Sequence, residues 1–222
     1  MFRWFLMPAL ALAAPAAAWP SHVGAGGPPA GQPFVLAFGD SLTAGYGLDR
    51  GQGFVPQLQA ALKRQGIETH IHDAGVSGDT SSGGKGRLKW TLDGLPRRPD
   101  LAIVELGAND MLRGVDPRVT EANLDAICAE LKRRGIPILI AGMRAAPNLG
   151  PDYRRRFEGI YPMLARKYGA PLYPFFLAGV AGNRGLVLSD GLHPNAAGIQ
   201  TIVAAILPTV QRALARPNAN AR

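Results

Sequence analysis

Residues 34–46 have the sequence FVLAFGDSLTAGY, and this stretch decides which fold the chain is predicted to adopt. Its first five residues are all apolar and lead into a Gly-Asp-Ser turn, which is typical of a central strand in a parallel sheet. Ser41 then follows the carboxyl end of that strand, where open α/β sheets bind their ligands. Serines after strands commonly cap helices or turns, so Ser41 alone does not establish a function.

Near the other end of the chain, Asp190 and His193 lie three residues apart in the segment SDGLHP. A serine early in the chain, followed late by Asp and then His, is a usable order for a nucleophile, an orienting acid and a base. His193 is the candidate base, because His22 lies in a Gly/Pro-rich leader and the remaining two, His70 and His72, lie on a predicted edge strand. In the alternative interpretation, Asp190 caps the last helix and His193 only packs locally. These two residues alone leave both interpretations open.

Strand and helix patterns alternate along residues 34–215, which predicts one α/β domain. We expect a flavodoxin-like three-layer sandwich of about five parallel strands with helices on both faces. The predicted strands are 34–38, 67–73, 101–106, 136–141 and 171–173, and the predicted helices are 53–65, 87–93, 120–134, 152–168 and 196–214.

Two further residues follow strands of this predicted sheet. Gly75 comes after the second strand and Asn109 after the third, and the carboxyl ends of parallel strands open on one edge. An acyl-transfer site needs fixed donors for the developing oxyanion. The backbone N–H groups of Ser41 and Gly75 and the side-chain amide of Asn109 are the candidates. In the alternative interpretation, Gly75 and Asn109 are ordinary turn residues.

Composition excludes several other classes of function. The formal net charge is +8, but the basic residues form separate pairs and triplets without interleaved aromatic residues, which does not favour nucleic-acid binding. The only cysteine, Cys128, lies on an apolar helical face and is predicted to be a buried hydrophobe. The four histidines show no metal-ligand spacing, so we expect no metal site.

The amino-terminal residues resemble a secretory signal. In residues 1–18, one basic residue precedes an apolar stretch that ends in three alanines, and we expect cleavage near Ala18. An uncleaved interfacial anchor is the less favoured alternative. Residues 19–33 are predicted to be a flexible leader and residues 216–222 a disordered tail. We therefore expect the protein to be periplasmic or secreted.

Four sequence blocks together resemble the SGNH (GDSL) hydrolase family. They are Gly-Asp-Ser41-Leu, Ala-Gly75-Val-Ser-Gly-Asp-Thr, Gly-Ala-Asn109-Asp and Asp190-Gly-Leu-His193-Pro. The resemblance implies that Ser41 is the nucleophile, that Asp190 and His193 are acid and base, and that Gly75 and Asn109 complete the oxyanion hole. Within the family, residues 41–46, 77–81, 109–114 and 190–195 resemble the bacterial periplasmic thioesterase/protease/lysophospholipase and arylesterase group. Residues 143–153 are similar to the mobile substrate loop of that group.

This resemblance implies a secreted serine hydrolase that needs no cofactor and acts on aryl esters, acyl thioesters and lysophospholipids. It implies small-molecule acyl substrates, possible contact with a lipid surface, and no obligate protein or nucleic-acid partner. One alternative is a carbohydrate O-acetyl esterase of the same family. Another is a non-catalytic module that binds lipids or glycans, although such a module need not retain all four catalytic residue types.

Overall fold

The computed structural model describes residues 31–216. The predicted signal peptide, most of the leader and nearly all of the tail lie outside these residues. The strands are β1 (Phe34–Gly39), β2 (His70–Gly75), β3 (Leu101–Glu105), β4 (Ile138–Ala141) and β5 (Leu172–Tyr173). The helices are α1 (Ser41–Ala44), α2 (Phe54–Arg64), α3 (Ser81–Asp93), α4 (Ala108–Leu112), α5 (Pro117–Arg133), the 3-10 turn η1 (Pro147–Leu149), α6 (Gly150–Tyr168) and α7 (Ala196–Leu214).

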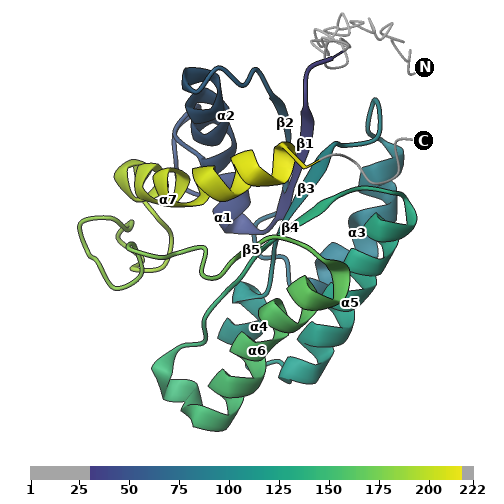
Figure 1. Cartoon of the computed structure of the whole chain (residues 1–222). Helices are drawn as coiled ribbons and strands as arrows, with labels where there is room; N and C mark the ends of the chain where they lie inside the picture. The colour runs from purple at the N-terminus through teal and green to yellow at the C-terminus, as the bar shows by residue number, and fades with distance from the viewer. Residues whose placement is uncertain (1–30, 217–222) are drawn as a thin grey trace, which may run out of the picture.

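All five strands are parallel and lie in the order β2-β1-β3-β4-β5 (Figure 1). This is the flavodoxin-like order, in which ligands bind where the strand order reverses, beside β1. Gly39 at the end of β1 is paired with Gly75 on one side and Glu105 on the other, so three strands end at one level. The predicted α/β fold is confirmed.

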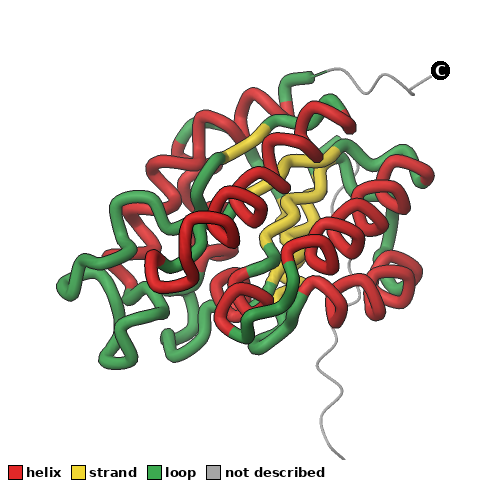
Figure 2. Tube along the Cα trace, turned by 90° about the horizontal axis from the view of Figure 1, so that it is seen from below, coloured by secondary structure: helices red, strands yellow, loops and turns green. Residues whose placement is uncertain are grey.

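Helices cover both faces of the sheet, as the view along it shows (Figure 2). Helices α2 and α7 pack against each other on one face, while α5 packs between α3 and α6 on the other. Every residue of β1 is buried, because this strand is covered on both faces. In the described residues, α7 is the one helix long and apolar enough to cross a membrane, but its buried face contributes Ile199, Ile202 and Ile206 to the core.

Helix α3 differs from its prediction because it begins at Ser81 rather than at residue 87. The Gly/Ser-rich composition of residues 81–86 suggested a connecting loop. In the structure, the side chain of Thr80 accepts a hydrogen bond from the Gly83 N–H and caps this helix. Gly84 is needed because a Cβ there would lie 2.5 Å from a methyl carbon of Leu106 in the core. Tertiary packing therefore offsets the low helix propensity of the glycines.

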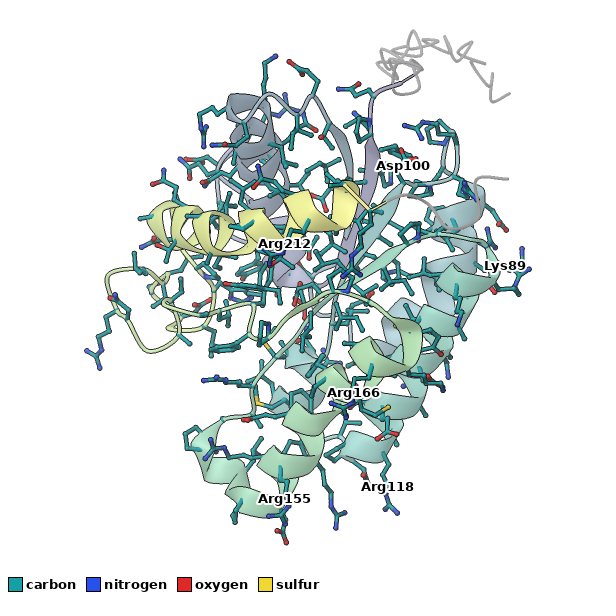
Figure 3. All side chains as sticks on the ribbon, in the orientation of Figure 1. Lys89, Asp100, Arg118, Arg155, Arg166 and Arg212 are labelled. Atoms are coloured by element: carbon teal, nitrogen blue, oxygen red, sulfur yellow. The ribbon has the colours of Figure 1, made fainter. Side chains whose placement is uncertain are left out.

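The positive charge is spread over several helices rather than gathered in one patch. Five basic side chains that Figure 3 marks illustrate this, since they come from four helices: Lys89, Arg118, Arg155, Arg166 and Arg212. Three of these form ion pairs with a carboxylate within four residues of their own position. Such exposed pairs contribute little to stability.

Candidate active site

Ser41 is the first residue of the single-turn helix α1, which begins directly after β1. The carboxylate of Asp40 caps this turn by accepting a hydrogen bond from the Leu42 N–H at 3.0 Å. Gly45 ends the turn in the left-handed region, at φ 73°. Ser41 is only 8% exposed. The strand end therefore presents this hydroxyl at a defined place on the catalytic edge of the sheet, the edge formed by the carboxyl ends of the strands.

The loop before α7 carries Asp190 and His193 to the same place. Its two ends are joined by a bridge between Val187 and Pro194, and the Leu188 N–H donates to the carbonyl of His193 at 2.7 Å. Asn195 then caps α7, with its side chain accepting from the Gly198 N–H at 3.0 Å. Asp190 does not cap this helix, which removes the alternative interpretation of that residue.

The three predicted catalytic side chains form one hydrogen-bonded chain. The Oγ atom of Ser41 lies 2.9 Å from Nε2 of His193. The Nδ1 atom of His193 lies 2.6 Å from Oδ2 of Asp190. The other carboxylate oxygen of Asp190 accepts the backbone N–H groups of Leu192 and His193. These bonds, with that to the imidazole the largest contribution, lower the pKa of Asp190 to about 2.

Sequence reasoning missed Tyr46 as a neighbour of the base. The ring of Tyr46 lies against the imidazole of His193, with a centroid separation of 4.4 Å. It is 52% exposed, so it covers one side of the imidazole at the rim of the site. The one feature of the sequence that could have indicated this contact is that Tyr46 lies five residues after Ser41.

Asn109 lies in the first turn of α4, directly beyond β3. Its Nδ2 atom donates to the carbonyl of Asp79 at 2.9 Å and to Oδ2 of Asp40 at 3.2 Å. Gly107 enables this position through its φ of 119°. A Cβ at that glycine would also meet the hydroxyl of Tyr161 at 2.3 Å. The structure therefore brings Asn109 to the residue that precedes Ser41, and its role as an oxyanion donor stays a prediction.

Gly75 ends β2 as expected, but its N–H donates to the side chain of Asp73 at 2.9 Å. A Cβ at Gly75 would lie 2.3 Å from the backbone nitrogen of Ala44, so the packing of α1 requires this glycine. Gly78 has φ 84°, and its N–H has no hydrogen-bond partner within residues 31–216. It directly precedes Asp79, the partner of the Asn109 amide. Gly78 is therefore the better-placed candidate for the backbone donor, and the role of Gly75 stays a prediction.

A mainly apolar cavity of about 320 Å³ opens beside these groups. Ser41, Asn109 and His193 lie at its wall. The apolar part of the lining comes from α1, α4 and the loops after β4 and β5, and includes Leu42, Met111, Leu112, Met143, Phe175 and Leu177. The volume falls at the small end of the usual range for ligand sites. The arrangement can hold an acyl chain next to a nucleophile.

Two buried carboxyl groups lie beneath the nucleophile turn. Glu105 is completely buried, and its Oε2 atom accepts a hydrogen bond from the Thr43 hydroxyl at 2.8 Å. Its Oε1 atom has no partner in the described part of the chain. Burial, reinforced by the charge of Asp40, raises the pKa of Glu105 well above its usual value. Burial likewise raises the pKa of Asp40 to about 6.

These shifts predict a stability that falls as the pH rises. Between the pKa values of the unfolded and folded states, the folded protein binds more protons at Asp40 and Glu105, so alkali favours unfolding. We expect the wild type to lose free energy of unfolding between about pH 5 and about pH 8, and Glu105→Gln to lose less. Urea denaturation of both proteins at both pH values measures the difference. An equal loss in both proteins would contradict the prediction.

Comparisons with known proteins identify the family of this chain. Residues 37–200 match the GDSL-like lipase/acylhydrolase family. The chain is 37% identical over 177 residues to the esterase TesA of Pseudomonas aeruginosa, which covers 80% of this chain and 87% of that one. It is 36% identical over 161 residues to thioesterase 1/protease 1/lysophospholipase L1 of Escherichia coli, covering 72% and 75%. The crystal structure of AlinE4, an SGNH-hydrolase family esterase, is 52% identical, with a TM-score of 0.71 over 83% of this chain and 98% of AlinE4. The chain therefore belongs to the GDSL-like lipase/acylhydrolase family and is a serine esterase.

Proposed function

We propose that this protein hydrolyses aryl esters, acyl thioesters and lysophospholipids through an acyl-enzyme on Ser41. The observation that carries the proposal is the hydrogen-bonded chain of Ser41, His193 and Asp190 at the wall of an apolar cavity. The names of the related proteins, which include an esterase, an arylesterase and a thioesterase/lysophospholipase, support the same range of substrates.

In the first half of the reaction, Oγ of Ser41 attacks the acyl carbonyl carbon while its proton passes to Nε2 of His193. The carboxylate of Asp190 holds the imidazole so that Nε2 faces the hydroxyl, and it stabilises the imidazolium that forms. The tetrahedral intermediate then collapses. The leaving alcohol or thiol takes the proton from Nε2, and the acyl group remains on Ser41.

In the second half, a water molecule gives a proton to Nε2 of His193 and attacks the acyl-enzyme. Collapse of this intermediate releases the fatty acid, and Oγ of Ser41 recovers its proton from Nε2. In both halves the carbonyl oxygen becomes an oxyanion. We assign the N–H of Ser41, the N–H of Gly78 and the side-chain amide of Asn109 as the donors that stabilise it. The longer of the two hydrogen bonds of that amide, at 3.2 Å to Asp40, is the one that would be exchanged for the oxyanion.

The apolar lining of the cavity favours acyl chains over acetylated sugars. Each methylene that leaves water for the cavity contributes about 0.8 kcal/mol, which raises kcat/KM about fourfold. The gain ends when the cavity of about 320 Å³ is full. A carbohydrate ring would instead present hydroxyl groups to methionine, leucine and phenylalanine side chains, which offer no hydrogen bonds.

We therefore expect kcat/KM for p-nitrophenyl esters to rise about fourfold per methylene from acetyl to a medium chain, and to fall at palmitoyl. The measurement is a series from acetyl to palmitoyl on the purified enzyme. An acyl-CoA, a lysophospholipid and an acetylated sugar complete the panel.

Turnover confined to acetyl groups would overturn this substrate range and favour the carbohydrate esterase. Absence of turnover on every substrate would favour the binding module. The substitution Phe175→Ser provides a control inside the cavity, because it should lower the gain per methylene while the acetyl ester is cleaved as before.

We also propose that the protein is exported. The support is the apolar stretch and the three alanines within residues 1–18, which precede the catalytic domain.

A further inference from the structure

One arginine on α3 points toward the catalytic edge of the sheet rather than into solvent. Its Nε atom lies 2.6 Å from Oδ2 of Asp79, and its Nη2 atom donates to the carbonyl of Gly39 at 2.9 Å. The guanidinium of this residue, Arg87, also lies 4.1 Å from the ring centroid of Phe38. The side chains of Arg87 and Asp79 are only 18% and 16% exposed. The ion pair of Arg87 with Asp79 is thus shielded from solvent, and its geometry is fixed.

The partners of Arg87 belong to the segments that form the oxyanion site. Gly39 is the last residue of β1 and lies two positions before Ser41. Asp79 follows Gly78 directly, and its carbonyl accepts the amide of Asn109 at 2.9 Å. One guanidinium therefore joins the strand end before the nucleophile to the loop that carries Gly78 and orients Asn109.

We propose that Arg87 is a positioning residue for the oxyanion hole, fixing the loop of residues 78–79 against the end of β1. This inference rests on the acyl-transfer function proposed above. Arg87 does not line the cavity, so it acts through Asp79 and Gly39 and not by touching substrate. A displacement of catalytic groups by about 1 Å lowers rates by about 100-fold, so a small movement of this loop would have a measurable effect.

An arginine suits this position better than a lysine. The guanidinium is planar and presents donors in a fixed fork, so it bonds a carboxylate and a carbonyl at once while its face packs on an aromatic ring. A lysine ammonium keeps the charge but not the planar face or the fork. Arg87→Lys should therefore restore only part of what Arg87→Met removes.

The test compares Arg87→Met and Arg87→Lys with Lys89→Met on the full enzyme. Lys89 is a matched control, because it lies two residues further along α3, pairs with Asp93 and projects into solvent (Figure 3). We expect Arg87→Met to lower kcat for a medium-chain p-nitrophenyl ester by about 10- to 100-fold, with KM changed by less than about threefold. Arg87→Lys should lose less, and Lys89→Met should match the wild type within about twofold.

An alkyl boronic acid separates positioning from plain stability. Its adduct with Ser41 places an oxygen in the oxyanion hole, whereas a fatty alcohol only fills the cavity. For Arg87→Met, the affinity for the boronic acid should fall by the same factor as kcat/KM, and the affinity for the alcohol should stay unchanged. Both are measured well below the unfolding temperature of each variant. If Arg87→Met does not fold, Asp79→Asn replaces it, since this change keeps the carbonyl that bonds Asn109 and should give a smaller loss of the same kind.

Two results would overturn the inference. One is that kcat and boronic acid affinity stay within about twofold of wild type in Arg87→Met or Asp79→Asn. The other is that boronic acid and alcohol affinities fall together, which indicates general loosening. The proposed function fails separately, through a fully active Ser41→Ala enzyme. An inactive Ser41→Ala enzyme beside an unaffected Arg87→Met enzyme would leave the function standing and remove only the role of Arg87.

Discussion

Ser41→Ala is expected to lower kcat for p-nitrophenyl esters by about 10⁴-fold or more. The hydroxyl is 2.9 Å from Nε2 of His193 and stands at the wall of the cavity, and no acyl-enzyme forms without it. Ser41 is small and buried, and the loss of its hydroxyl oxygen leaves the side chain of Asp40 in place as the cap of α1. The variant should therefore fold like the wild type. Steady-state kinetics and covalent labelling with a fluorophosphonate measure the effect.

The double substitution Ser41→Ala with His193→Ala should be no slower than either single one, because the two side chains act as a unit. Ser82→Ala is the control, since this serine lies exposed on α3 and makes no contact in the catalytic chain. Retention of more than about 1% of the activity by Ser41→Ala would assign the nucleophile elsewhere.

Asp190→Asn is expected to lower kcat by about 10³- to 10⁴-fold, and more than Asp190→Ala. The Oδ1 atom of Asp190 accepts two backbone N–H groups, from Leu192 and His193. An asparagine must keep its carbonyl oxygen there, which turns its NH₂ group toward Nδ1 of the imidazole. The ring then carries its proton on Nε2 and cannot accept a proton from Ser41. Alanine removes the carboxylate but leaves the imidazole of His193 free to carry its proton on either nitrogen.

The comparison between Asp190→Asn and Asp190→Ala is the informative measurement. Nitrogen NMR of the imidazole of His193 should find the proton on Nε2 in the asparagine variant and on Nδ1 in the wild type. Equal activity of Asp190→Asn and the wild type would show that Asp190 does not orient the base. Greater loss in Asp190→Ala than in Asp190→Asn would contradict the argument from the tautomer.

Strands and helices could be predicted from the local sequence where all residues of an element are buried to the same degree. The strands predicted at 34–38 and 101–106 became β1 and β3, because strands covered on both faces need mostly apolar residues, with Glu105 the charged exception in β3. The first residues of α3 were not accessible, since serines and glycines there are stabilised by contacts with distant residues. Ser81 donates its N–H to Asp110 at 2.7 Å, 29 positions along the chain. The predicted edge strand from residue 67 begins only at His70, where pairing with β1 starts.

The sequence by itself named the candidate residues of the site, and the four sequence blocks together favoured a hydrolase. Ser41, Asp190 and His193 could be named because nucleophile, acid and base need those residue types, and because strand ends of a parallel sheet meet at one edge. It also determined the sheet, since residues apolar on both faces belong in the middle of an α/β fold.

Only the tertiary structure decided which groups are free to act. The N–H of Gly75 is paired with Asp73, whereas that of Gly78 has no partner among residues 31–216, and this difference depends on loop conformation. The contact of Arg87 with Gly39 spans 48 positions, and the burial of Glu105 beside Asp40 depends on strand pairing. Hydrogen bonds and desolvation depend on distances of a few ångströms between segments that are remote in sequence. Local residue patterns carry no information about such distances, and the packed fold sets them.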